Sequence, residues 1–181
     1  MARSVQLHTE RLLLRRYKSS DITAIVRLIG AREVAATTLR IPHPYTEKDA
    51  RELLKQLAKD KTQSRFGIFL RESGELCGGV GLNLDLQHDR AELGYWIGVP
   101  YWGKGIATEA AREVVRYGFE NLGLHRIFAN CYVGNTASQR VLERLGMRNE
   151  GRFRQHVKKW GEYKDLENYG FTVDDWRAGR L

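Results

Sequence analysis

The segment between residues 90 and 122 constrains the fold more than any other part of the sequence. Its first part, Arg90–Val99, has the composition of a β-strand, and Pro100 ends that strand because proline has no N–H to donate to a sheet. A loop with two glycines follows. Apolar residues then recur at three- and four-residue spacing from Gly103 to Leu122, which predicts a long amphipathic helix. A strand, a glycine loop and a long helix in direct succession indicate a sheet with a helix packed on its face.

The rest of the chain supplies shorter elements of both kinds. Six further segments have the pattern of strands: Arg11–Tyr17, Phe66–Arg71, Leu76–Leu84, His125–Val133, Met147–Phe153 and Tyr163–Val173. Three further helices are predicted from caps and apolar spacing: Ser19-Ser20-Asp21 to Gly30, a helix that begins at Thr46 with Asp49 completing a capping box, and Asn135–Leu145 with Gly146 at its end. The sequence therefore predicts one α+β domain over residues 1–181, with a mixed sheet of about seven strands and about four helices.

Composition excludes several classes of protein. Hydrophobic residues make up 42% of the chain, and the mean hydropathy is −0.49. No apolar run approaches the roughly 20 residues that cross a bilayer, and the first residues lack the apolar stretch of a secretory signal. We therefore expect a cytoplasmic protein with no membrane partner. Cys77 and Cys131 lie in strand-like segments and are expected to be buried, and the scattered histidines form no metal-binding motif.

The net charge of +8 does not identify a partner by itself. Thirty Lys and Arg residues oppose 22 Asp and Glu residues, but they are spread along the chain and form no basic tail or block. The charge alone does not indicate a nucleic-acid partner, because a cofactor that carries several phosphates accounts for it equally well.

The loop Trp102–Thr108 has the features of an anion site. Gly103 and Gly105 let the backbone approach a ligand closely, and Ala107 is small enough for tight contact with the helix. Main-chain N–H groups at a helix N-terminus, together with the helix dipole, suit a pyrophosphate, and Lys104 adds positive charge. A tight turn built from glycines is the alternative interpretation. The loop is too short for a Rossmann fingerprint, and it is not a Walker loop.

Two neighbouring segments extend this candidate site. Gly94 and Gly98 weaken the strand before the loop, unless a bulge or a close ligand requires them. A strand that separates from its neighbour there would leave main-chain groups for an extended chain of amides such as pantetheine. Asn135 is expected to cap the helix that follows it. Ser138 falls in the first turn of that helix, where its hydroxyl either points into a cleft or has no role.

Motifs along the whole chain resemble the GNAT superfamily of acetyltransferases. The motifs are E-L-G-Y-W-I at Glu92–Ile97, W-G-K-G-I-A-T-E-A at Trp102–Ala110 and N-T-A-S-x-x-V-L-E-R-L-G-M at Asn135–Met147. The opening T-E-R-L-L-L-R at Thr9–Arg15 and the closing segment after Gly151 resemble the RimJ/RimL-type branch, whose members acetylate protein N-terminal amines or small amines. The resemblance implies a GNAT-like fold with a mostly antiparallel sheet, and an N-acetyltransferase that uses acetyl-CoA and no metal.

The same resemblance implies roles for particular residues. It places main-chain contacts with pantetheine at Ile97 and Val99. Asn130 and Asn135 match positions that commonly face the cofactor, and Ser138 matches a position proposed to protonate the leaving thiolate. Trp102 is a departure, because many members of the superfamily carry Gln or Arg there. The pyrophosphate is assigned to the main-chain amides of Gly103, Lys104, Gly105, Ile106, Ala107 and Thr108.

Direct attack of an amine on a thioester in a ternary complex requires removal of a proton from the amine. Glu92 is the first candidate for the general base, acting through water, and a strand carboxylate paired with Arg90 is the alternative. Some related enzymes carry a carboxylate after the penultimate strand, where this chain offers His156 as a substitute for proton transfer or substrate contact. A surface or hydrogen-bonding histidine is the alternative. Tyr45 and Trp160 are further candidates to line the substrate site, unless they are simply packed aromatic residues.

The acceptor is the least determined part of this interpretation. Either the N-terminal amine of a peptide or a small amine would serve, and the basic charge slightly favours the peptide. A non-catalytic acyl-CoA-binding or regulatory module of the same fold is the alternative function, because it would share the phosphate loop without needing an acid or a base. Exposed aromatic residues near the C-terminal strands are compatible with a homodimer.

Overall fold

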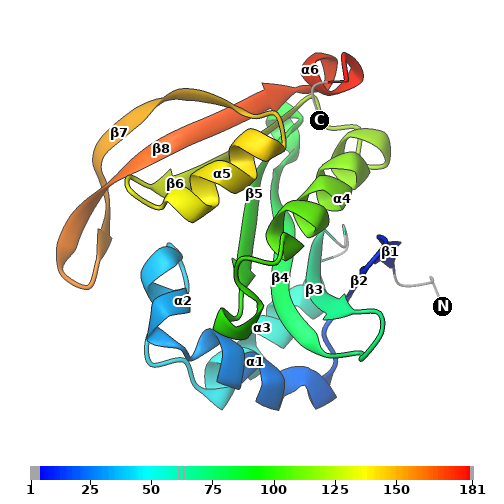
Figure 1. The fold of residues 1–181 in the computed structure, drawn as a ribbon, viewed down its shortest axis with the longest axis vertical. Coiled ribbons are helices and arrows are strands. Elements are labelled where there is room, and N and C mark those ends of the chain that lie inside the picture. The colour runs from blue at the N-terminus through cyan, green and yellow to red at the C-terminus, as the bar shows by residue number, and fades with distance from the viewer. Residues whose placement is uncertain (1–4, 61, 63, 180–181) are drawn as a thin grey trace. The chain divides into compact units, whose positions relative to one another are not determined.

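The computed structural model describes residues 5–60, 62 and 64–179 of the chain (Figure 1). The described residues divide into two compact units. The first comprises the described part of Met1–Gly81 together with Tyr95–Val114, and the second comprises Leu82–Gly94 and the described part of Val115–Leu181. Three elements run through both units: β4 (Leu76–Asp85), β5 (Arg90–Ile97) and α4 (Ile106–Glu120). A single domain over residues 1–181 stays a prediction.

Eight strands make up the sheet within the described ranges, and each unit holds consecutive strands. The first unit has β1 (Leu7–His8), β2 (Leu12–Arg15), β3 (Arg65–Leu70) and the start of β4 in that order. The second unit has the start of β5, then β6 (Arg126–Tyr132), β8 (Glu162–Thr172) and β7 (Arg148–Lys159). The β5–β6 pair is parallel, whereas β1–β2, β2–β3, β3–β4, β6–β8 and β7–β8 are antiparallel, so the predicted mixed and mostly antiparallel sheet is confirmed.

The core of the first unit forms where helices cover the sheet. The helices are α1 (Ile22–Ile29), α2 (Arg32–Thr37) and α3 (Glu47–Lys59), and α1 packs against α3 (Figure 1). The apolar face of α1 supplies much of a buried cluster that also includes Phe69 of β3 and Leu76 of β4. The expected capping box of α3 is present, because Thr46 accepts a hydrogen bond from the Asp49 amide and the Asp49 carboxylate accepts one from Thr46 N.

In the second unit, alternation along β6 separates a buried face from a partly exposed one. Ile127, Ala129 and Cys131 are buried, and Gly118 of α4 lies against Ile127. The helix α5 (Thr136–Arg144) follows β6 and lies beside it, while β7 and β8 extend as a long hairpin (Figure 1). The predicted end of α5 is confirmed, because Gly146 has a φ of 84°, the left-handed conformation that commonly ends a helix.

The structure corrects several element boundaries. The strand predicted to end at Phe153 continues to Lys159, because pairing with β8 holds a segment whose exposed polar residues show no apolar alternation. The long helix begins at Ile106 rather than Gly103. Three elements were not predicted: β1, α2 and α6 (Val173–Arg177). β1 has two residues and α2 has six, which are too few to establish a periodicity. α6 had a local signal that was missed, because Thr172 and Asp175 form a capping box at its start.

Gly78 on β4 is predicted to be required by packing in the first unit. A Cβ atom added there would lie 2.4 Å from the carbonyl oxygen of Trp96 and 2.8 Å from Cδ1 of Ile97. We therefore expect Gly78→Ala to lower the free energy of unfolding by about 1–3 kcal/mol, the usual cost of overpacking. Urea unfolding measures the change. Gly94→Ala on β5 is the matched control, because no other described atom lies within 4 Å of its added Cβ. Equal losses in both variants would contradict the prediction.

Candidate active site

The loop before α4 has the backbone that an anion site requires. Gly103 and Gly105 have φ values of 73° and 76°, a left-handed conformation that side chains other than glycine disfavour. Among the described residues, no other atom lies within 4 Å of a Cβ added at Gly103. The helix begins directly afterwards at Ile106, and the amides of a first helical turn have no carbonyl partner within the helix. The predicted pyrophosphate loop therefore has a suitable conformation at a suitable place.

A cluster of hydrogen bonds joins the N-terminal segment to this loop. The Glu109 carboxylate in the first turn of α4 accepts hydrogen bonds from the Thr9 hydroxyl at 2.5 Å, the Arg11 amide at 3.0 Å and the Arg11 Nε at 2.7 Å. The Arg11 guanidinium also donates to the carbonyl oxygen of Lys104 at 3.1 Å. Burial acts to raise the pKa of Glu109, but the hydrogen bonds from Thr9 and Arg11 outweigh it and lower this pKa below its usual range.

Some of the main-chain groups near Ile97 and Val99, where pantetheine is predicted to bind, already form hydrogen bonds with other residues of the chain. The indole Nε1 of Trp102 donates to the carbonyl oxygen of Ile97 at 2.7 Å, and the Trp102 amide donates to the carbonyl oxygen of Val99 at 3.2 Å. The amide of Gly98 donates to Cys77 on β4 at 2.9 Å. The strand was expected to separate from its neighbour and to leave such groups unpaired. That expectation is wrong for the carbonyl oxygens of Ile97 and Val99 and for the amide of Gly98. Trp102, expected to matter through its backbone alone, also contributes a side-chain hydrogen bond.

In the second unit, Glu92 belongs to a row of polar side chains across three strands. The Asn130 side-chain amide donates to the Glu92 carboxylate at 3.3 Å, and Asn168 on β8 donates to the Asn130 side-chain oxygen at 2.9 Å. Because Asn130 donates on one side and accepts on the other, its amide orientation is determined by its neighbours. Arg90, named as the possible partner of Glu92 in the alternative interpretation, contacts Asp85 at 2.9 Å, and the choice between the two interpretations of Glu92 stays open.

Asn135 and Ser138 lie at the start of α5. The Asn135 side chain accepts a hydrogen bond from the Ser138 amide at 3.1 Å, which confirms the predicted cap. Burial raises the pKa of the Cys131 thiol to about 11, and a hydrogen bond with Ser138 acts in the opposite direction. Ser138 therefore contacts Cys131, whereas Glu92 contacts Asn130. Neighbouring residues on a strand point to opposite faces, so Glu92 and Ser138 lie on opposite faces of the sheet in this unit.

The three candidates for substrate contacts lie in two different environments. Tyr45 packs against the core of the first unit, and burial raises its pKa to about 12. His156 follows Gln155, whose φ is 47°, inside an irregular stretch of β7 where the register shifts against β8, and its ring lies 5.0 Å from that of Phe153. Trp160 is exposed at the turn of the hairpin. Their roles in substrate binding stay predictions.

Several residues of these networks were not predicted from the sequence. Arg11 and Glu109 lie inside motifs that carried the family resemblance, but 98 residues separate them in the chain. Asn168 lies on a strand that was predicted, but the register of this strand with β6 was not. Only the pairing of Asn130 with Asn168 brings those two side chains together.

Other kinds of site receive no support from the described residues. No group of three or more His, Cys, Asp and Glu side chains in the described ranges could hold a metal ion. Within the same part of the chain, no helix is long and apolar enough to cross a membrane. Cys77 and Cys131 are buried free thiols, which confirms the expectation made from their neighbours.

Comparisons with known proteins agree with this description. Residues 11–148 match the family model of the acetyltransferase (GNAT) domain. The uncharacterized N-acetyltransferase p20 of Bacillus licheniformis is 34% identical over 172 residues, which cover 92% of this chain and 94% of that protein. The [ribosomal protein uS5]-alanine N-acetyltransferase of Escherichia coli is 29% identical over 130 residues, which cover 71% of this chain and 67% of the enzyme.

A solved structure shows the same fold. The crystal structure of the acetyltransferase (GNAT family) from Bacillus anthracis has a TM-score of 0.84 and 29% sequence identity, and the match covers 94% of this chain and 99% of that one. The chain therefore belongs to the GNAT acetyltransferase family. It is an N-acetyltransferase, and the ribosomal-protein relative agrees with the RimJ/RimL-type branch that the motifs indicate. The predicted fold is confirmed, and the described residues form eight strands and six α-helices in place of about seven and about four.

Both thiols are predicted to be unreactive in the folded protein at pH 8. Burial raises the pKa of Cys77 to about 12 and that of Cys131 to about 11, so both remain protonated. Because only the thiolate attacks a disulfide reagent, we expect labelling by DTNB to be slower than in urea by about 100-fold or more. Absorbance at fixed reagent concentration measures both rates, with N-acetylcysteine as a control for the reagent. Rapid labelling of either thiol in the native protein would disagree with this prediction.

Proposed function

We propose that this N-acetyltransferase uses acetyl-CoA, and that the loop Gly103–Thr108 binds its pyrophosphate. The supporting observation is the backbone of that loop, in which two glycines with positive φ lead directly into the N-terminus of a 15-residue helix. The helix dipole and the amides of the first turn together attract an anion. Lys104 is exposed and can add a charge, and its Nζ lies 5.6 Å from the centre of the Tyr101 ring.

Acetyl-CoA would supply the acetyl group as a thioester. The main chain near Ile97 and Val99 would position the pantetheine arm, in which case the bond from Trp102 to the Ile97 carbonyl is either shared or exchanged for a cofactor amide. A carbonyl oxygen has two lone pairs and can accept both bonds. Asn130 and Asn135 are proposed to face the cofactor.

Glu92 is proposed to accept the proton of the amine, through water, and Ser138 to donate a proton to the leaving sulfur. Asn130 and Asn168 orient the Glu92 carboxylate through successive hydrogen bonds. The acid and the base lie on opposite faces of the sheet in their unit and need not touch each other. Each acts on a different atom, since the amine nitrogen loses a proton and the sulfur gains one.

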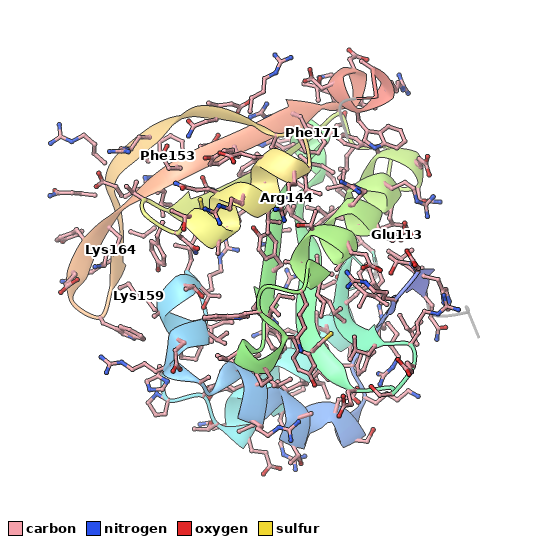
Figure 2. All side chains as sticks on the ribbon, in the orientation of Figure 1. Glu113, Arg144, Phe153, Lys159, Lys164 and Phe171 are labelled. Carbon is pink, nitrogen blue, oxygen red and sulfur yellow. The ribbon has the colours of Figure 1, made fainter. Side chains whose placement is uncertain are left out.

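The acceptor is proposed to be the N-terminal amine of a protein. The Escherichia coli relative is named for an alanine of ribosomal protein uS5. The net charge of +8 disfavours a polycationic amine, because like charges repel at long range. The β7–β8 hairpin, on which Figure 2 labels Phe153 and Lys164, carries exposed aromatic side chains at Phe153, Trp160 and Tyr163. Such a surface suits a peptide chain. A small amine is the alternative acceptor. His156 and Trp160 on this hairpin are proposed to contact the acceptor, and a contact of Tyr45 with the acceptor is a separate proposal.

Three broader expectations remain proposals. We propose that residues 1–181 act as one catalytic domain, that the protein is cytoplasmic, and that it forms a homodimer. Sedimentation of the purified protein would distinguish a dimer from a monomer directly.

The proposed function predicts release of coenzyme A only when an acceptor amine is present. We expect the thiol to appear with peptides that begin in a small residue, and the acetylated peptide to be found by mass spectrometry. Gly105→Trp should abolish acetyl-CoA binding in calorimetry, because a large side chain at a φ of 76° disrupts the loop. Gly74→Trp, at an exposed position of the turn between β3 and β4 with a φ of 72°, is a control for bulk at a positive φ. Normal affinity in the Gly105 variant would remove the pyrophosphate assignment.

Separate variants test the two proton-transfer roles. Removal of a general acid or base typically costs about 100- to 10,000-fold in rate, so we expect Glu92→Gln and Ser138→Ala to lower kcat by at least about tenfold. The choice of acceptor should distinguish the two variants. An amine of low pKa is already deprotonated and needs no base, so it should reduce the loss of kcat in Glu92→Gln but not in Ser138→Ala. Ser138→Cys is the matched control, because a thiol keeps a donor. Unchanged kcat at saturating substrates would count against either role.

A further inference from the structure

We infer that Arg11 and Glu109 form a brace that sets the direction of the pyrophosphate-binding amides. This inference rests on the proposed function and concerns residues outside the loop itself. Neither residue is assigned a contact with acetyl-CoA. Both are therefore positioning residues, and their effect is transmitted through the main chain of Lys104, Gly105 and Ile106.

The brace is built from contacts between two distant segments of the first unit. Arg11 Nη2 lies 2.6 Å from one oxygen of Glu109, and Arg11 Nε lies 2.7 Å from the same oxygen. The second oxygen accepts from the Arg11 amide and the Thr9 hydroxyl at 3.0 and 2.5 Å. The Glu109 side chain is 19% exposed, although half of the Arg11 side chain is accessible. Four donors thus hold one carboxylate in a fixed position.

The third nitrogen of the guanidinium extends this arrangement to the loop. Arg11 Nη1 donates to the carbonyl oxygen of Lys104 at 3.1 Å. That oxygen shares a planar trans peptide unit with the amide of Gly105, so the two groups point in opposite directions. A carbonyl held toward Arg11 therefore turns the Gly105 N–H away from Arg11. The position at which an anion could bind this amide is set by a side chain from the N-terminal segment.

The other member of the pair fixes the next peptide unit. The Glu109 amide donates to the carbonyl oxygen of Gly105 at 3.1 Å, which is the first turn of α4. The amide of Ile106 belongs to the same peptide unit as that carbonyl and points the opposite way, out of the helix N-terminus. Two successive amides thus have fixed directions: the Arg11 side chain sets that of Gly105, and the main-chain bond of the first helical turn sets that of Ile106. Glycine at 105 accepts the required φ of 76° without the steric cost that other residues incur.

The two possible roles of Glu109 predict opposite effects of one substitution on acetyl-CoA binding. A carboxylate in the first turn of α4 stabilises the helix dipole but repels a pyrophosphate bound at the same helix end. If Glu109 acted only through its charge, Glu109→Gln would strengthen acetyl-CoA binding. If Glu109 acts as a brace, the same change weakens binding, because in either orientation the amide nitrogen of glutamine would face an N–H of Arg11 and could not accept its hydrogen bond.

We expect Glu109→Gln to raise the Kd of acetyl-CoA about tenfold in calorimetry, the size of one charge-assisted hydrogen bond. The KM for acetyl-CoA should rise by the same factor, while kcat at saturation stays within about twofold, because the reacting atoms are not touched. Arg11→Lys should behave in the same way although it keeps the charge, because one ammonium group cannot span the carboxylate and the Lys104 carbonyl. The double variant should be little weaker than either single one.

Glu120→Gln is the matched control, because Glu120 pairs with Arg116 at 2.6 Å at the other end of the same helix. It should leave Kd and KM within about twofold of the wild type. Wild-type or tighter binding by Glu109→Gln would overturn the inference and leave the proposed function intact. Thermal melting checks that each variant is folded, and if Glu109→Gln is unfolded, Arg11→Lys decides the matter, with unchanged Kd refuting the brace. A wild-type protein that does not bind acetyl-CoA would refute the proposed function itself.

Discussion

The main-chain amides at the start of α4 are the feature on which the rest of the first unit depends. An α-helix leaves the amides of its first turn without partners in the helix. A ligand can bind several of these amides together only if their directions are fixed. Two glycines allow the backbone to turn before the helix, and the contact of Arg11 with Glu109 and Lys104 holds that turn in place. The glycine-rich sequence of β4 serves the same region, because Gly78 and Gly79 let Trp96 and Tyr17 approach closely.

The second unit places its polar side chains in two separate groups. Glu92, Asn130 and Asn168 follow one another across neighbouring strands on one face, and Ser138 lies with Cys131 on the other. Strand geometry produces this separation, since successive side chains alternate between faces.

Much of the fold could be predicted from the sequence because its elements are strongly patterned. The strand before Pro100, the capping box at Thr46 and the glycine after α5 are local signals, and local signals decide local structure. The segment Arg154–Lys159 was missed because its exposed residues show no alternation, and only the neighbouring strand β8 makes it a strand. The candidate loop was predicted for the same local reason, whereas the hydrogen bonds of Trp102 with Ile97 and Val99 were not.

By itself, the sequence determined the class of the fold, the family and the position of the glycine loop before α4, because glycine, proline and helix caps act on their immediate neighbours. Only the tertiary structure decided which distant residues meet. Arg11 reaches Glu109 across 98 residues, and Asn130 meets Asn168 through strand register. The structure also showed that Arg90 contacts Asp85, and that the Glu92 carboxylate accepts a hydrogen bond from the Asn130 side chain. Such pairs depend on the packing of whole strands and helices, and spacing along the chain contains no record of that packing.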